Sequence, residues 1–209
     1  MNIIESLEWR YACKKFDPSK KLTNTQIDTL KNAFNLTPTS FGLQPIKMIV
    51  IKEQKLKDKF FPHSYFQEQV KTCSHLLVLC IDTIVDEKTI DNYFDYEKKV
   101  RGTTEDVVGT FRKQLKGMYG DMTAEDIERS SVYQTYIALG NLMTVCAVEK
   151  IDNCPMEGFV PAKIDEILGL KEKNLKSVLM LPVGIRAEDD IMSGMKKVRK
   201  PLKDIVIEL

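Results

Sequence analysis

Histidine, tryptophan and paired cysteines are scarce in this sequence of 209 residues, and their scarcity removes several classes of site. The chain has two histidines and five cysteines, and no two cysteines form a CxxC pair. Because zinc sites take most of their ligands from these residue types, we predict no metal site. The odd number of cysteines also argues against a disulfide framework and for reduced thiols in the cytoplasm.

Long apolar runs and a dominant sign of charge are absent as well. No stretch reaches the ~20 apolar residues that a membrane span needs, and no N-terminal segment resembles a signal peptide. With 31 basic and 30 acidic residues, the formal net charge is +1. This balance predicts no binding to nucleic acid or to a membrane surface. We therefore expect one cytoplasmic domain that covers residues 1–209.

The sequence also contains neither a GxGxxG motif after a strand nor a P-loop, so a doubly wound dinucleotide fold is not expected. Short apolar runs at 48–51, 75–81 and 177–184 predict buried strands, and helical segments separate them. This order favours a mixed β-sheet with helices on both faces. A terminal β-type run at 205–209 is expected to add to a sheet edge, on a partner subunit if not on its own chain.

Several segments carry helix signals. Thr23 and Gln26 form a predicted capping box, and Gly169 is expected to close a short amphipathic helix. The stretch 127–148 is nearly apolar all round, which predicts a helix in the middle of the structure. The charged stretch 82–128 indicates two or three exposed helices.

Two groups of basic residues lie at opposite ends of the sequence. The first helix is expected to end near Tyr11, with Arg10 and Lys14 four residues apart on one helix face. A second basic group follows at 196–200. Either both groups are ordinary solvated surface, or they converge on one anion such as a phosphate.

Four motifs resemble the FMN-dependent nitroreductase family when they are taken in order. They are Arg-Tyr-Ala-Cys-Lys-Lys-Phe-Asp-Pro at 10–18, Pro-Thr-Ser-Phe-Gly-Leu-Gln-Pro at 38–45, Pro-Met-Glu-Gly-Phe at 155–159 and Lys-Val-Arg at 197–199. The branch most similar is the NAD(P)H-dependent oxygen-insensitive nitroreductases and flavin reductases. The resemblance implies an α+β fold and a homodimer with FMN at the subunit interface. It also implies a C-terminal arm that adds a strand to the partner subunit.

The resemblance assigns roles to particular residues. It places the FMN phosphate on Arg10, Lys197 and Arg199, and the pyrimidine edge of the flavin on Lys14 and Gln67. It implies that the backbone of 157–158 lies beside flavin N5. It also implies that the loop 38–42 and the central helix of the other subunit contact the same flavin. The implied cofactor residues are Arg10, Tyr11, Ala12, Lys14, Pro38, Thr39, Ser40, Gly42, Gln67, Gln134, Pro155, Met156, Glu157, Gly158, Lys197 and Arg199, and the implied substrate residues are Phe41, Lys14 and Lys71.

The implied reaction passes a hydride from NAD(P)H to N5 of FMN, and then electrons to a nitroaromatic, a quinone or free flavin. No side chain is expected to act as acid, base or nucleophile, because the cofactor supplies the chemistry. Other activities on the same scaffold stay open: enone reductase, dehalogenase and flavin destructase. So do a non-catalytic flavin-binding protein and an interaction domain whose basic ends meet an acidic partner.

Overall fold

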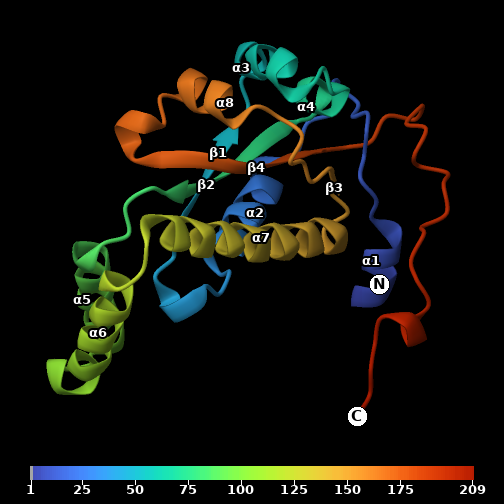
Figure 1. The fold of residues 1–209 in the computed structure, drawn as a ribbon. Coiled ribbons are helices and arrows are strands. Elements are labelled where there is room, and N and C mark those ends of the chain that lie inside the picture. The colour runs from blue at the N-terminus through green and yellow to red at the C-terminus, as the bar shows by residue number, and fades with distance from the viewer. Residues whose placement is uncertain (1) are drawn as a thin grey trace.

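The fold is built on one antiparallel sheet with the strand order β1-β2-β4-β3 (Figure 1). We describe residues 2–209 in a computed structural model. β2 and β4 form the centre of the sheet, and seven of the eight residues of β2 are buried. The strands are β1 (Ile46–Ile51), β2 (His75–Asp82), β3 (Asp152–Asn153) and β4 (Leu175–Gly184).

All named strand pairs are antiparallel, and the mixed character of the sheet comes from an isolated parallel bridge between Ala12 and Asn153. The three strands expected from apolar runs are present. Two of them begin two residues earlier than the sequence predicts, at Ile46 and Leu175. The expectation of an α+β fold is confirmed.

Helices cover both faces of the sheet, as expected (Figure 1). α3 (Gln54–Phe60), α4 (Glu68–Thr72) and α8 (Pro161–Leu168) pack on one face, and α2 (Asn24–Asn35) and α7 (Ala124–Val148) pack on the other. β2 serves both cores because successive side chains of a strand alternate between faces. Leu76, Val78 and Cys80 belong to the first core, and Leu77 and Leu79 to the second.

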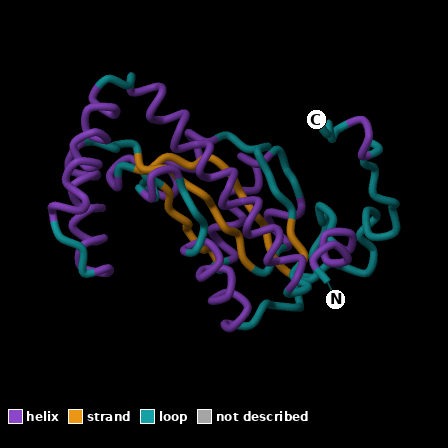
Figure 2. Tube along the Cα trace, turned by 90° about the horizontal axis from the view of Figure 1, so that it is seen from below, coloured by secondary structure: helices purple, strands orange, loops and turns teal. Residues whose placement is uncertain are grey.

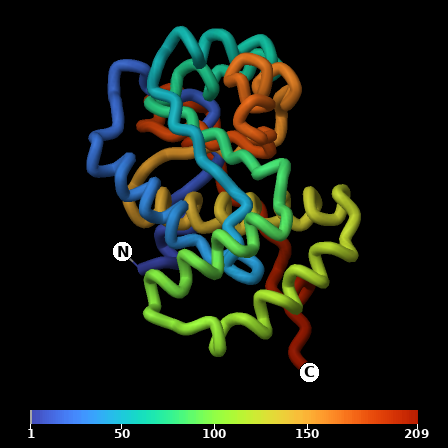
Figure 3. Tube along the Cα trace, turned by 90° about the vertical axis from the view of Figure 1, so that its left-hand side faces the viewer, coloured from blue at the N-terminus to red at the C-terminus, as the bar shows by residue number. Residues whose placement is uncertain are grey.

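The charged stretch between β2 and α7 forms a helical hairpin that stands away from the sheet (Figures 1 and 3). α5 (Glu87–Arg101) and α6 (Glu105–Gly120) pack through a small core of their own. Gly102 makes the turn possible because its φ of 69° lies in the left-handed region. The hairpin therefore accounts for the exposed helices expected in this region.

The local helix signals have mixed outcomes. The Thr23–Gln26 capping box is present, and Gly169 closes α8 in a left-handed conformation. α1 (Ile3–Trp9), however, ends before Tyr11, so the expected helix face carrying Arg10 and Lys14 does not exist. The backbone is already extended at Arg10, and the Cys13 N–H donates to the Asn153 carbonyl at 3.0 Å. Pairing with β3 has replaced the last helical turn.

The long helix α7 is central, but it is buried on one side only. It begins at Ala124, three residues before the predicted start, because Thr123 caps it. Tyr133, Tyr136 and Ile137 are 58%, 43% and 47% exposed, so one side of this nearly apolar helix faces outward in the single chain. Within residues 2–209 no helix has both the length and the apolar character to cross a bilayer.

The C-terminal segment leaves the body of the molecule and stands apart from it (Figure 2). A short 3-10 turn at Leu202–Asp204 is its one regular element after residue 200, and residues 205–209 are exposed. The run expected to form a strand therefore does not pair within its own chain. Its exposed apolar side chains are Leu202, Ile205, Val206, Ile207 and Leu209.

Candidate functional site

The two basic ends of the sequence meet in one groove of about 500 Å³. Arg10, Lys197 and Arg199 line it, and the Nζ of Lys197 donates a hydrogen bond to the Arg10 carbonyl. Arg10 and Arg199 lie close enough that, after burial, the Arg199 charge is the next cause that lowers the pKa of Arg10. The convergence of both chain ends is thus achieved within a single chain.

The electrostatics of this groove fit an anion. Burial lowers the pKa of Lys197, and the charges of Arg10 and Arg199 lower it further. The Nε of Arg10 is buried and has no hydrogen-bond partner within the described residues. An orphaned buried donor is costly, and like charges in contact repel. A phosphate would supply the missing acceptor and offset the repulsion, so these residues fit the phosphate of FMN.

The extended segment after α1 is held by a buried carboxylate. Asp190 accepts a hydrogen bond from the Tyr11 hydroxyl at 2.8 Å and one from the Lys14 backbone N–H at 3.1 Å. Burial and the bond to Asp190 both raise the pKa of Tyr11. Tyr11 therefore holds the segment in place as a neutral hydrogen-bond donor.

Arg186 supports the same segment through two aromatic rings. Its guanidinium stacks on the rings of Trp9 and Tyr11, 4.6 Å from each centroid. Its Nε donates to Asp152 at 2.7 Å, and Lys150 lies 4.4 Å from the centroid of the same indole. The backbone on both sides of Arg10 is therefore fixed by packing as well as by hydrogen bonds.

Lys14 points toward the loop after β3. Its Nζ lies 3.6 Å from the sulfur of Cys154. Burial raises the pKa of the Cys154 thiol, and the charges of Lys14 and Arg10 oppose that rise. The ammonium of Lys14 thus lies beside Cys154, the residue that directly precedes the segment 155–158.

Two side-chain hydrogen bonds, one from the N-cap residue of α4 and one from α7, hold the loop 155–158. The side chain of Gln67 donates to the Gly158 carbonyl at 2.8 Å, and the Tyr136 hydroxyl of α7 donates to Glu157 at 2.8 Å. A Cβ on Gly158 would lie 2.8 Å from the Gln67 amide nitrogen, so a larger residue would push the two apart. The buried Met156 pairs through its backbone with Met180 of β4, and Pro155 precedes it in the same loop.

A second group of expected residues gathers around the loop 38–42. The side chain of Gln134 accepts a hydrogen bond from the Ser40 N–H at 2.9 Å. The ring of Phe41 is 42% exposed and lies 6.2 Å from that of Phe111 in α6. Gly42 has a φ of +73°, and Tyr93 occupies the space that a Cβ would need. The expected residues of this group are Pro38, Thr39, Ser40, Phe41, Gly42 and Gln134.

The two groups are attached to different sides of α7. Gln134 and Tyr136 are two residues apart, which turns their side chains by about 200° around the helix. One bonds the loop 38–42 and the other bonds the loop 155–158. Lys71 joins neither group through its side chain, since its Nζ lies 5.2 Å over the ring of Phe61.

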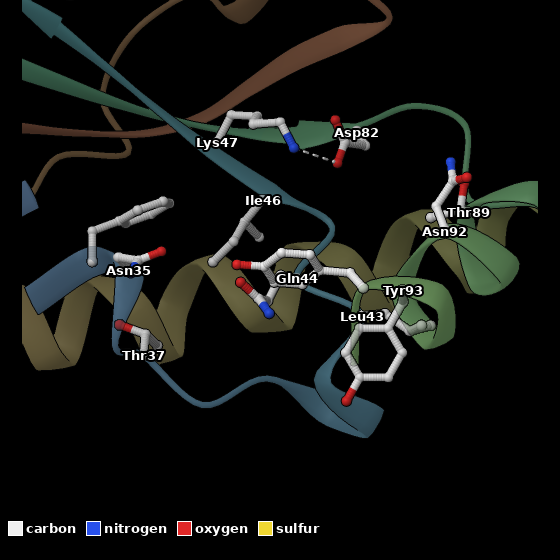
Figure 4. A pocket seen from close by; sticks show the side chains of 12 residues that line it. Asn35, Thr37, Leu43, Gln44, Ile46, Lys47, Asp82, Thr89, Asn92 and Tyr93 are labelled. Carbon is white, nitrogen blue, oxygen red and sulfur yellow. Dashed lines mark hydrogen bonds and ion pairs between the residues drawn. The ribbon is translucent and has the colours of Figure 1, made fainter. Parts of the chain in front are cut away.

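A further cavity of about 490 Å³ lies behind the loop 38–42, between β1, α2 and α5 (Figure 4). Its lining includes Tyr93 and the ion pair of Lys47 with Asp82, 3.2 Å apart. Because that lysine is already paired with a carboxylate, the cavity is a poorer phosphate site than the groove at Arg10.

Several residues of the site were missed by sequence reasoning. No sequence motif predicted the contacts that five residues make with expected site residues. They are Asp190, Cys154, Tyr136, Tyr93 and Phe111. Tyr136 had a partial signal, since a tyrosine on an apolar helix needs a partner for its hydroxyl.

Comparison with known sequences identifies the family. The profile described as Nitroreductase family matches residues 7–185. The chain belongs to the nitroreductase family. The match contains every expected site residue of this nitroreductase except Lys197 and Arg199, which follow it.

Individual relatives align with this chain over nearly its whole length. "Putative NAD(P)H nitroreductase SH0546" of Staphylococcus haemolyticus is 32% identical over 98% of this chain and 95% of its own. The "Oxygen-insensitive NAD(P)H nitroreductase" of Salmonella typhimurium is 28% identical, with both chains fully covered. Among solved structures, a "putative nitroreductase in complex with FMN" from Exiguobacterium sibiricum superposes with a TM-score of 0.85 at 23% identity, covering 100% of this chain and 98% of that one.

Proposed function

We propose that this nitroreductase is an FMN-dependent oxidoreductase that takes a hydride from NAD(P)H and passes electrons to nitroaromatics, quinones or free flavin. The observation that carries the proposal is the meeting of Arg10, Lys197 and Arg199 around a groove in which a buried Arg10 N–H lacks an acceptor. The names of the relatives support the same reaction, since two are named as NAD(P)H nitroreductases and one structure is described as a complex with FMN.

The groove would hold the phosphate of FMN. A phosphate ester carries nearly two negative charges at neutral pH, and charge-assisted hydrogen bonds contribute about 1.5–3 kcal/mol each. Arg10 offers a guanidinium fixed at the end of α1, while Lys197 and Arg199 come from the exposed C-terminal segment. The phosphate would therefore close the groove by fixing that segment against α1.

The flavin ring would lie along Lys14, Gln67 and the loop 155–158. Bound FMN supplies the hydride acceptor and the electron donor of the reaction. The ammonium of Lys14 would favour negative charge on the nearby ring edge. Gly158 lets its backbone approach a flat ligand closely, because no side chain stands in the way. Tyr136 and Gln67 hold that backbone in place through Glu157 and Gly158.

The substrate would stack near the two exposed aromatic rings Phe41 and Phe111. Both are more than two-fifths exposed, and Phe111 also packs edge-on against Phe94 at 5.9 Å. Flat electron acceptors such as nitroaromatics and quinones suit aromatic stacking. The hairpin α5–α6 would thus shape the substrate side of the site.

The active form would be a homodimer in which the loop 38–42 completes the partner's flavin site. Apolar side chains are exposed on α1, on α7 and along the C-terminal arm, and exposed surface of this kind marks interfaces. The arm residues 205–209 would add to the partner's sheet. We place the enzyme in the cytoplasm, where its five free, buried cysteines stay reduced.

An absorption spectrum of the purified protein tests the proposal. We expect flavin bands near 370 and 450 nm at about one FMN per chain, and loss of the 450 nm band on anaerobic addition of NADPH or NADH. Reoxidation by a nitroaromatic, a quinone, free FMN and an enone would then rank the acceptors. A colourless protein that does not bind added FMN would refute the proposal, and a yellow protein that neither nicotinamide bleaches would leave only a flavin-binding role.

A further inference from the structure

Asp190 is a buried carboxylate bonded to Tyr11, which lines the proposed phosphate groove, and it connects distant parts of the chain. Its exposed fraction is 3%. One oxygen accepts from the Tyr11 hydroxyl and the Lys14 N–H, and the other accepts from the Met192 N–H at 3.1 Å. The first two partners lie 179 and 176 residues away in sequence.

The segments that Asp190 joins are the ones that carry the cations. Arg10 and Lys14 flank Tyr11 on one side of the carboxylate. On the other side, residues 191–200 run through turns and irregular backbone to Lys197 and Arg199. The Lys197 side chain then returns to the Arg10 carbonyl. Asp190 is thus the buried attachment from which the exposed cationic segment starts.

Hydrogen bonding keeps this carboxylate ionised. Burial alone would raise the pKa of Asp190, but hydrogen bonding from Met192, Tyr11, the Cys13 thiol and Lys14 outweighs burial and lowers it. A carboxylate that accepts several hydrogen bonds is rigid, since turning it would break all of them at once. These bonds therefore fix the start of the cationic segment.

We propose that Asp190 is a positioning residue for phosphate recognition, because its bonds to Tyr11, Lys14 and Met192 set the distance between Arg10 and the cations of the C-terminal segment. The inference rests on the proposed function, in which that groove takes the FMN phosphate. Asp190 does not touch the phosphate in this scheme. It acts through the backbone that carries the three cations.

Selective loss of phosphate recognition is the expected signature. Flavin binding to apoprotein can be followed for FMN and for riboflavin, which differ only in the phosphate. In Asp190→Asn we expect the Kd for FMN to rise at least tenfold and that for riboflavin to change less than twofold. Asp189→Asn is the matched control, since Asp189 is exposed and pairs with Lys15 at the surface. It is expected to change neither Kd by more than twofold.

Tyr11→Phe gives a second test if Asp190→Asn fails to fold. Removing that hydroxyl deletes one of the three bonds, and we expect the Kd for FMN to rise about threefold, again with riboflavin unchanged. If both variants fold, the double variant should lose no more than Asp190→Asn alone, because the hydroxyl acts through the carboxylate.

Three outcomes would overturn the inference while leaving the proposed function intact. One is unchanged FMN affinity in both variants. Another is an equal loss for FMN and riboflavin, which would indicate a general structural role. The third is tighter FMN binding in Asp190→Asn, because the carboxylate would then act mainly as a repelling charge. Failure of the wild-type chain to bind FMN at all would instead refute the proposed function, and the inference with it.

Discussion

The Tyr136 hydroxyl donates a 2.8 Å hydrogen bond to Glu157, joining the middle of α7 to the loop that we place beside the flavin. The bond to the carboxylate is the largest cause that raises the pKa of Tyr136. Both side chains are exposed in the single chain, so the bond contributes little to folding. Its effect is to orient the loop 155–158.

Tyr136→Phe is therefore expected to weaken FMN binding while leaving the stability of the fold almost unchanged. We expect the free energy of unfolding to fall by less than about 1 kcal/mol, because an exposed hydrogen bond contributes little. The Kd for FMN should rise two- to fivefold, since Glu157 is released. Urea denaturation and flavin titration measure the two quantities. Tyr133→Phe, on the same helix and more exposed, is the control and should change neither.

Reversing the charge of the C-terminal cations should produce apoprotein. Loss of two charge-assisted bonds at about 1.5–3 kcal/mol each predicts an FMN affinity at least about a hundredfold lower for Lys197→Glu with Arg199→Glu. Flavin content after purification checks this. Lys55→Glu with Lys59→Glu makes the same change of net charge on the exposed side of α3 and should keep the flavin. A full complement of FMN in the first double variant would exclude the groove as the phosphate site.

Gly42→Ala tests the contact between the loop 38–42 and the hairpin α5–α6. A non-glycine residue at a φ of +73° costs about 1–2 kcal/mol, and the new Cβ would also displace Tyr93. We expect a loss of at least about 2 kcal/mol in the free energy of unfolding. Gly117→Ala in α6, where a Cβ meets open space, should instead add about 0.5–1 kcal/mol.

A double-mutant cycle separates the two costs at Gly42. With Tyr93→Ala in the background, the steric part of the loss should disappear and the backbone part should remain. The cycle therefore predicts a favourable coupling between the two substitutions. Strict additivity would show that Tyr93 moves aside freely.

His75 should make stability depend on pH in a defined window. Burial, followed by the charges of nearby lysines with Lys52 first, lowers the pKa of His75 from 6.5 to about 4. Between pH 6.5 and 4, His75 therefore binds a proton in the unfolded chain but stays neutral in the folded chain. Stability is complete above 6.5 and is lost as the pH falls toward 4, by up to about 3 kcal/mol. Urea unfolding at several pH values should show this slope, and His75→Gln should flatten it.

The matched variant for that measurement is His63→Gln. His63 lies half-buried in the 3-10 turn before α4, and its replacement leaves His75 in place. The slope between pH 4 and 6.5 should therefore persist. If both variants lost it equally, a change in overall fold rather than the titration of His75 would be responsible.

The exposed side of α7 should hold two chains together. Ile137→Asp places a charge on that side and is expected to give a monomer by analytical ultracentrifugation, with loss of flavin because the partner's loop is absent. Val100→Asp at the exposed end of α5 is the control. A wild-type chain that is monomeric at micromolar concentration would contradict the dimer.

Sequence patterns predicted the parts of this fold that depend on neighbours in the chain. The Thr23 capping box, the glycine stop at Gly169 and the apolar strand 75–81 are local signals, and each is present. The end of the first helix was predicted wrongly because the Cys13 N–H bonds to Asn153, far along the chain. No local pattern contains that information.

The candidate site divides in the same way. The cations at both chain ends could be identified because four motifs in order resemble a known family. Asp190 could not, since its role depends on a hydrogen bond across 179 residues. The sequence also could not predict that α7 is buried on one side only. An apolar helix has the same residue pattern whether it packs against its own core or against a second chain.

Trp9, whose indole contacts both Arg186 and Lys150, is the single tryptophan of the sequence and directly precedes Arg10. Excitation at 295 nm therefore reports from one spot in the molecule, at the edge of the groove. Native emission should dim when a yellow ligand arrives there, through energy transfer. The intrinsic fluorescence of Trp9 should therefore report flavin binding in the wild-type chain without an added label.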